Sequence, residues 1–149
     1  MSGYGRADSE WDELVHAGRG FLVERAKLGK LTSYTELNVT LARRTGCRPF
    51  DFERADERAA MGHLLGLIVE RDQEMAPSDP PVMLSALVNY LGANDAGSGF
   101  YQLAKELQLL PMSASADEKF GFWVQASETA LRTPWSWSSR GLRSSTLSV

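Results

Sequence analysis

The sequence contains one cysteine and two histidines among its 149 residues. A lone Cys47 excludes a disulfide within the chain and a zinc site built from several cysteines. His16 and His63 are too few for a metal cluster, and we expect neither a metal nor a cofactor. No stretch approaches the roughly 18 apolar residues of a membrane helix, and the N-terminus lacks the apolar core of a signal peptide. We therefore expect a protein of the reducing cytoplasm that does not enter membranes.

Catalytic motifs are also scarce. Ser85 has no surroundings that resemble a nucleophile elbow, and no motif places a histidine to activate it. The acids between Asp51 and Glu57 lack the oxygen spacing of a calcium loop and are typical of a helix start. The sequence therefore favours a non-enzymatic protein, with an enzyme of unknown chemistry as an alternative.

The content of hydrophobic residues, 43%, is sufficient for one compact domain with a substantial core. Residues 1–8 are polar and contain glycine, which predicts a flexible lead-in. We assign residues 9–131 to a single helical domain. Residues 132–149 are rich in serine and arginine and contain no acid, which predicts a disordered tail whose Trp135 and Trp137 dock on the body or on a partner.

Helix signals recur along the domain. Ser9 and Asp12 resemble the start of a helix that runs to about Leu28 and ends at Gly29. Ser33 and Glu36 have capping-box spacing and predict a second helix that ends at Gly46. Later apolar stripes predict a helix from about Asp56 to Glu74 and another between Gly99 and Pro111. A last helix is predicted after the capping pair Ser115 and Glu118. Its expected buried face consists of Phe120, Trp123, Val124 and Leu131.

Two glycines, Gly62 and Gly66, lie next to the apolar stripe of the third predicted helix. Each costs about 1 kcal/mol relative to alanine in a helix interior. We expect something to approach closely at these positions. A second helix or a strand is the structural interpretation, and a ligand or a nucleic-acid backbone is the functional one.

Residues 81–91 form an apolar run that follows a proline pair and ends in a Gly, Asn and Asp cluster. This pattern predicts a buried strand that ends in a turn. A lone strand needs a partner edge, which a hairpin or wing would supply. The expected fold is therefore mainly α with a small β-hairpin or wing, a winged-helix-like single domain.

Charge is distributed unevenly along the chain. Residues 25–48 carry six basic side chains and one acid, whereas residues 49–131 carry five basic and thirteen acidic side chains. The first segment is a candidate anion-facing surface. The alternative is that two solvated faces differ in sign, since Arg43 and Arg44 are also the residue type favoured at a helix C-terminus.

Three features in order resemble a known fold: the run from Thr32 to Leu37, the run from Arg58 to Gly62, and a proline-led strand followed by a glycine turn. Over residues 31–110 this order is similar to the winged-helix domain of the alkylguanine DNA alkyltransferases and their non-enzymatic relatives. The resemblance implies that Tyr34 contacts the DNA backbone and that Arg58 enters the base stack in the minor groove.

The reactive Cys-His-Arg of that family is missing, because Pro81 leads into Val82-Met83-Leu84-Ser85. Alkyl transfer needs a thiolate nucleophile, so the sequence excludes this chemistry. The whole chain also resembles a group of small actinobacterial or phage-type proteins, a resemblance that implies no known activity.

Three functional hypotheses follow. The first is DNA binding through a basic helical surface of Tyr34, Arg43, Arg44, Arg48 and Arg58. The second is a protein-interaction or regulatory module that uses the acidic region or the C-terminal tail. The third is a small-ligand pocket near His63, Ser85, Gly97, Gly99 and Phe100, where a glycine pair at a helix start can cradle a phosphate.

Overall fold

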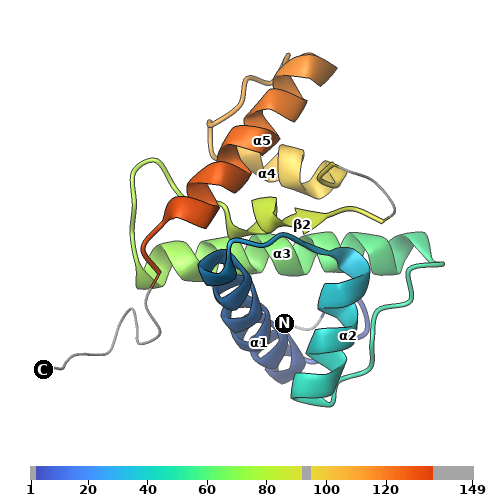
Figure 1. Ribbon diagram of the computed structural model, residues 1–149. Helices are drawn as coiled ribbons and strands as arrows, with labels where there is room; N and C mark the ends of the chain where they lie inside the picture. Colours follow the sequence, from blue (N-terminus) through green and yellow to red (C-terminus); the bar gives the residue numbers. More distant parts are fainter. Residues whose placement is uncertain (1–2, 92–94, 136–149) are drawn as a thin grey trace, which may run out of the picture.

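The computed structural model describes residues 3–91 and 95–135. These residues form a mainly α structure with five α-helices, one short 3₁₀-helix at Leu84–Leu87 and two short strands (Figure 1). The helices are α1 (Asp8–Leu28), α2 (Tyr34–Thr45), α3 (Ala55–Met75), α4 (Ser98–Glu106) and α5 (Ala116–Arg132). The strands are β1 (Thr32–Ser33) and β2 (Val88–Asn89).

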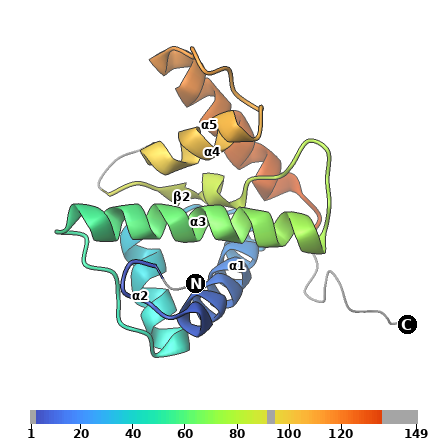
Figure 2. The same ribbon diagram turned by 180° about the vertical axis from the view of Figure 1, so that it is seen from behind.

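Helix α3 crosses the middle of the molecule. Helices α1 and α2 lie on one side of it, and α4 and α5 lie on the other (Figures 1 and 2). The buried side chains form two apolar clusters, to which α3 contributes on both sides. Leu64 and Ile68 belong to the larger cluster with α1 and α2. Val69 belongs to the smaller cluster with Phe100 of α4 and Trp123 of α5.

Local signals place the helix ends. The Ser33 hydroxyl accepts a hydrogen bond from the Glu36 amide, 3.1 Å away, as its capping position predicts. Gly29 and Gly46 take the left-handed conformation at the ends of α1 and α2, with φ of 70° and 77°. Helix α1, however, begins after Ala7 instead of Ser9, and the Ala7 amide donates to the Glu10 carboxylate.

The predicted wing is wrong. Residues 84–87 form a 3₁₀-helix, and only Val88 and Asn89 form a strand, which pairs in parallel with β1. A short apolar run does not by itself separate a strand from a buried helical turn, and here every residue from Met83 to Val88 is buried. The partner edge exists, but a parallel pair requires a crossover, which α2 and α3 supply, and so excludes a hairpin.

The last two helices also differ from expectation. Helix α4 ends at Glu106, before Gln108 with its positive φ of 63°. In α5 the capping pair Ser115 and Glu118 is confirmed, but of the predicted face only Trp123 is fully buried, and its indole donates to the Ala86 carbonyl at 2.9 Å. Phe120 is 42% exposed and Val124 is 36% exposed, so they do not belong to the core.

The ends of the chain differ from each other. Residues 3–7, expected to be a flexible lead-in, pack against the body, because Arg6 is only 1% exposed and its guanidinium lies 4.1 Å from the Phe50 ring centre. Trp135 is also buried, and its indole donates to the Ala130 carbonyl. The rest of the predicted tail, including Trp137, lies outside the described residues.

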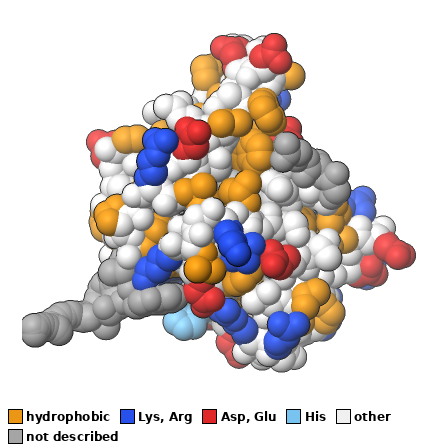
Figure 3. Space-filling model, in the orientation of Figure 1, with side chains coloured by type: hydrophobic (Ala, Val, Ile, Leu, Met, Phe, Trp, Pro, Cys, Tyr) orange, Lys and Arg blue, Asp and Glu red, His pale blue; other side chains and the backbone are white. Residues whose placement is uncertain are grey.

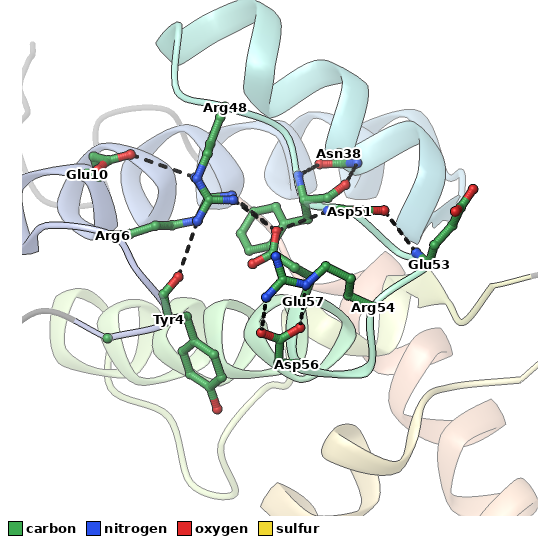
Figure 4. Close-up of polar contacts among 12 residues, drawn as sticks. Tyr4, Arg6, Glu10, Asn38, Arg48, Asp51, Glu53, Arg54, Asp56 and Glu57 are labelled. Atoms are coloured by element: carbon green, nitrogen blue, oxygen red, sulfur yellow. Dashed lines mark hydrogen bonds and ion pairs between the residues drawn. The ribbon is translucent and has the colours of Figure 1, made fainter.

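The buried Glu57 carboxylate ties the N-terminal segment to the start of α3 (Figure 4). It accepts hydrogen bonds from the Arg48 guanidinium at 3.0 Å and the Asp51 amide at 3.1 Å, and lies 4.0 Å from the Arg6 guanidinium. Arg48 also donates to the Tyr4 carbonyl. Desolvation lowers the pKa of Arg6, and the nearby Arg48 lowers it further. Glu57 is therefore the counter-charge that allows this segment to pack.

We predict that Glu57→Ala lowers the free energy of unfolding by about 3 kcal/mol, because breaking a buried pair leaves a buried charge without compensation. The measurement is urea unfolding followed by circular dichroism. The control is Asp56→Ala, whose carboxylate pairs with Arg54 on the surface, where solvent screens the pair, so its loss should be much smaller. Equal losses in the two variants would contradict a structural role for Glu57.

Candidate ligand-binding groove

The structure gives most of the predicted basic surface internal partners. Arg44 forms two hydrogen bonds of 2.9 Å with the Glu24 carboxylate, and Arg58 donates to the Phe52 carbonyl. Arg48 pairs with Glu57, as described above. Arg43 is exposed and makes no hydrogen bond or ion pair with a described residue. Figure 3 shows Lys and Arg side chains interspersed with Asp and Glu over one face of the molecule.

A groove of about 640 Å³ runs between α3 and α4. The two helices run in the same direction (Figure 2), so the groove follows successive turns of both. Arg58, His63 and Glu70 line it from α3, and Ser98, Gln102 and Glu106 line it from α4. Three tyrosines from other segments complete the walls: Tyr4, Tyr34 and Tyr90. Its volume lies within the usual range for ligand sites, about 300–1,000 Å³.

Glycines set the floor of the groove. A Cβ atom on Gly99 of α4 would lie 3.6 Å from the Gly62 Cα, so the two helices approach closely at this point, as the sequence predicted for Gly62. At Gly66 the expectation fails, because a Cβ atom there would meet no described atom within 4 Å. Gly66 lines the groove, where its missing side chain keeps the floor clear.

Tyr34 points a polar group into one end of the groove. The residue is 3% exposed, and its hydroxyl forms no hydrogen bond within residues 3–91 and 95–135. Burial, together with the adjacent Tyr90, raises the pKa of Tyr34 to about 12. The hydroxyl therefore stays protonated at neutral pH and is available as a hydrogen-bond donor.

The same end of the groove carries further hydrogen-bond donors. The first amides of α4, on Ser98 and Gly99, lie at a helix N-terminus, where N–H groups lack intrahelical acceptors and carry a partial positive charge. Arg58 reaches this end from α3 and has further guanidinium donors beyond the one bound to Phe52. The Arg58 end is defined here by Tyr34, Arg58, Ser98 and Gly99.

The opposite end of the groove is acidic. Glu70 of α3 and Glu106 of α4 both line it and are exposed to solvent. Glu106 accepts a hydrogen bond from Gln102 one turn earlier on α4. The groove therefore has opposite charges at its two ends.

Of the five predicted pocket residues, His63 and Gly99 line the groove. His63 packs edge-on against Trp11, with ring centres 5.1 Å apart. Gly97 is buried where its Cβ would lie 3.0 Å from the Tyr34 hydroxyl. Ser85 and Phe100 lie below the floor, around a cavity of about 10 Å³ that is also lined by Gly62, Gly66 and Gly99.

Sequence reasoning named Tyr34 and Arg58 for a DNA surface, and the structure brings both to the groove instead of joining them to Arg43 or Arg44. It missed Glu70 and Glu106, which have no local motif. The spacing of Gly62 and Gly66 was the available signal.

The described residues contain no group of three or more His, Cys, Asp or Glu side chains arranged to hold a metal ion. None of the described helices has the length and apolar character that a bilayer span requires.

No protein-family model matches the chain, and no curated protein or solved structure is significantly similar to it. The resemblance to the alkyltransferase winged helix therefore stays a prediction.

We predict that Gly66→Ala raises the free energy of unfolding by roughly 0.5–1 kcal/mol, because alanine is the better helix former and its methyl group meets open space. Chemical denaturation measures the change. Gly46→Ala is the opposite case and should cost about 1 kcal/mol, since its φ of 77° is unfavourable for alanine. A destabilised Gly66→Ala variant would show that this position is packed.

A second prediction concerns alkaline pH. The folded pKa of Tyr34, about 12, is above the unfolded value of about 10, so its contribution to stability is complete below pH 10 and is lost as the pH rises to 12. The loss is on the order of 2 kcal/mol, and Tyr34→Phe should remove it. Tyr101, whose pKa is raised by burial and by its hydrogen bond to Asp95, gives a loss of the same sign that remains in the variant. Unfolding measured from pH 8 to 12 tests this, and identical pH profiles would contradict it.

Proposed function

We propose that this protein is a non-enzymatic binding module that holds an anionic group of its ligand at the Arg58 end of the α3–α4 groove. The observation that carries the proposal is the Tyr34 hydroxyl, a donor on a buried residue that has no acceptor within the described part of the chain. A bound anion would supply that acceptor.

Several donors line the same end of the groove. A hydroxyl gains more from a hydrogen bond to a charged acceptor than to a neutral one. The amides of Ser98 and Gly99 favour negative charge because of the α4 dipole. Arg58 adds a full positive charge. A carboxylate or a phosphate matches these donors.

The proposal is for binding, not for chemistry. Within the described residues, no hydrogen bond joins His63 to a serine or to Cys47, so no activated nucleophile lines the groove. Ser85, which lines the small cavity below the floor, is 2% exposed and lies beneath the glycines.

Nucleic-acid binding is a second proposal, supported by one feature. Arg43 is exposed on α2 beside a shallow hollow that is also lined by Ser33, Thr35 and Thr40, with Glu36 and Val39. Hydroxyls and an unpaired arginine are typical phosphate contacts. This surface is separate from the groove and contains one of the four arginines that the sequence nominated.

The groove proposal is tested by titrating the protein with inorganic phosphate and with acetate while recording amide NMR spectra. We expect saturable shifts that are largest at Ser98 and Gly99. Arg58→Gln should weaken binding by about tenfold or more, because a hydrogen bond to a charged group contributes about 1.5–3 kcal/mol. Tyr34→Phe should weaken it by about twofold to tenfold.

The matched control is Arg54→Gln, which removes a guanidinium that pairs with Asp56 outside the groove. Its affinity should equal that of the unmodified chain. Shifts that do not saturate, or that Arg58→Gln leaves unchanged, would contradict the proposal. Salt-dependent binding of duplex DNA that is lost in Arg43→Glu would select the second proposal.

A further inference from the structure

We infer that the occupant of the groove is an extended peptide segment of a partner protein, with an acidic side chain at the Arg58 end and a basic side chain at the Glu70 end. This inference rests on the proposed function and identifies the class of ligand. The property that carries it is the opposite charge of the two ends of one continuous groove.

The spacing of the charges sets the size of the ligand. Arg58 and Glu70 are twelve residues apart on α3, which at 1.5 Å per residue places them about 18 Å apart along the helix. Glu106, the last residue of α4, also lines the groove, so a second carboxylate is present there. A phosphate or a free amino acid at the Arg58 end does not reach these acids, whereas an extended chain of about six residues does.

The shape of the groove suits a chain that lies along it. Gly62 and Gly66 repeat once per turn on its floor, and the position of a Cβ on Gly66 is open space. A peptide backbone can therefore approach α3 at a point where a larger residue would exclude it. The cost of a glycine in a helix interior, about 1 kcal/mol, has no other explanation in the packing around Gly66.

Both acids at the far end are exposed, and this favours a basic side chain that stays partly hydrated. Surface ion pairs of this kind contribute little each, so the basic group sets orientation more than affinity. The acidic side chain is the anchor, because it meets the unpaired hydroxyl of the buried residue Tyr34 and the α4 amides.

The test uses two blocked hexapeptides and the full chain. The first peptide has glutamate at one end, lysine at the other end, and glycine and serine between them. The second peptide is identical except that glutamine replaces the lysine. Binding is followed by isothermal titration and by the amide signals of Ser98 and Gly99. We expect the lysine peptide to bind about twofold to fivefold more tightly than the glutamine peptide, since two exposed carboxylates face the lysine.

Glu70→Lys combined with Glu106→Lys should abolish the difference between the peptides. Glu74→Lys combined with Glu128→Lys is the matched control: it makes the same change in net charge at exposed positions that do not line the groove, and it should keep the difference. Gly66→Leu should weaken the binding of both peptides at least tenfold, while its circular dichroism spectrum stays that of the folded protein.

The outcomes separate the two claims. Phosphate and both peptides could shift the amide signals of Ser98 and Gly99 while the two peptides bind with equal affinity. The ligand is then an anion without a basic end, so the inference is overturned while the proposed function stands. If neither phosphate nor either peptide shifts these amides, both fail. If Gly66→Leu binds the lysine peptide as the unmodified chain does, the peptide does not lie on the floor of the groove, and the inference is again overturned.

Discussion

The burial of α3 on two opposite sides is the constraint on which the rest of the fold depends. Leu64 and Ile68 pack toward α1 and α2, and Val69 packs toward α4 and α5. Full burial of a side chain of this size stabilises the fold by about 1.5–3 kcal/mol relative to exposure. Because neither apolar cluster is complete without α3, the two sides of the molecule depend on one element.

The groove follows from this arrangement. Helix α4 covers only part of α3, because the glycine contact at Gly62 brings the two helices together at one end of α4 while the next turn of α3, at Gly66, is left open. A glycine in the interior of a long helix lowers the stability of the helix, and at Gly66 no packing contact compensates for this loss. Costs of this kind concentrate at functional sites, where a shape is kept at the expense of stability.

The charged side chains around α1 and α2 differ in their pairing from those that line the groove. Around α1, α2 and the start of α3, arginines pair with Glu24 and Glu57, which fix the N-terminal segment and the ends of helices. In the groove, Arg58 and Glu70 lie at opposite ends and do not pair with each other. The positive charge of residues 25–48 therefore serves structure to a large extent, and the separated charges lie where the fold leaves space.

Sequence reasoning succeeded where a few neighbouring residues decide the structure. The serine that caps α2 and the glycines that end α1 and α2 are examples, because capping and left-handed φ are properties of one turn. It failed at residues 84–89, where burial by α5 and pairing with β1 choose between a 3₁₀ turn and a strand. Arg6 was missed for the same reason, since its burial depends on Glu57, fifty-one positions later in the chain.

Local sequence patterns also failed to predict which residues come together in the groove. Tyr34 and Arg58 were both named from local patterns, but for a surface that would have joined them to the basic residues of α2. Their actual neighbours come from α4, from Tyr90 after β2 and from Tyr4 near the N-terminus. No spacing in the sequence relates these segments, because α3 brings them together only through tertiary packing.

The contact between Gly62 and Gly99 is the most direct test of this account, because the position of α4, the open turn at Gly66 and the separation of charges all depend on it. The measurement is the nuclear Overhauser effect between the α-protons of these two residues. The structure predicts a strong cross-peak, since a Cβ on Gly99 would lie 3.6 Å from the Gly62 Cα. A spectrum in which both glycines are assigned and the cross-peak is missing would contradict the packing of α4 on α3, and with it the groove.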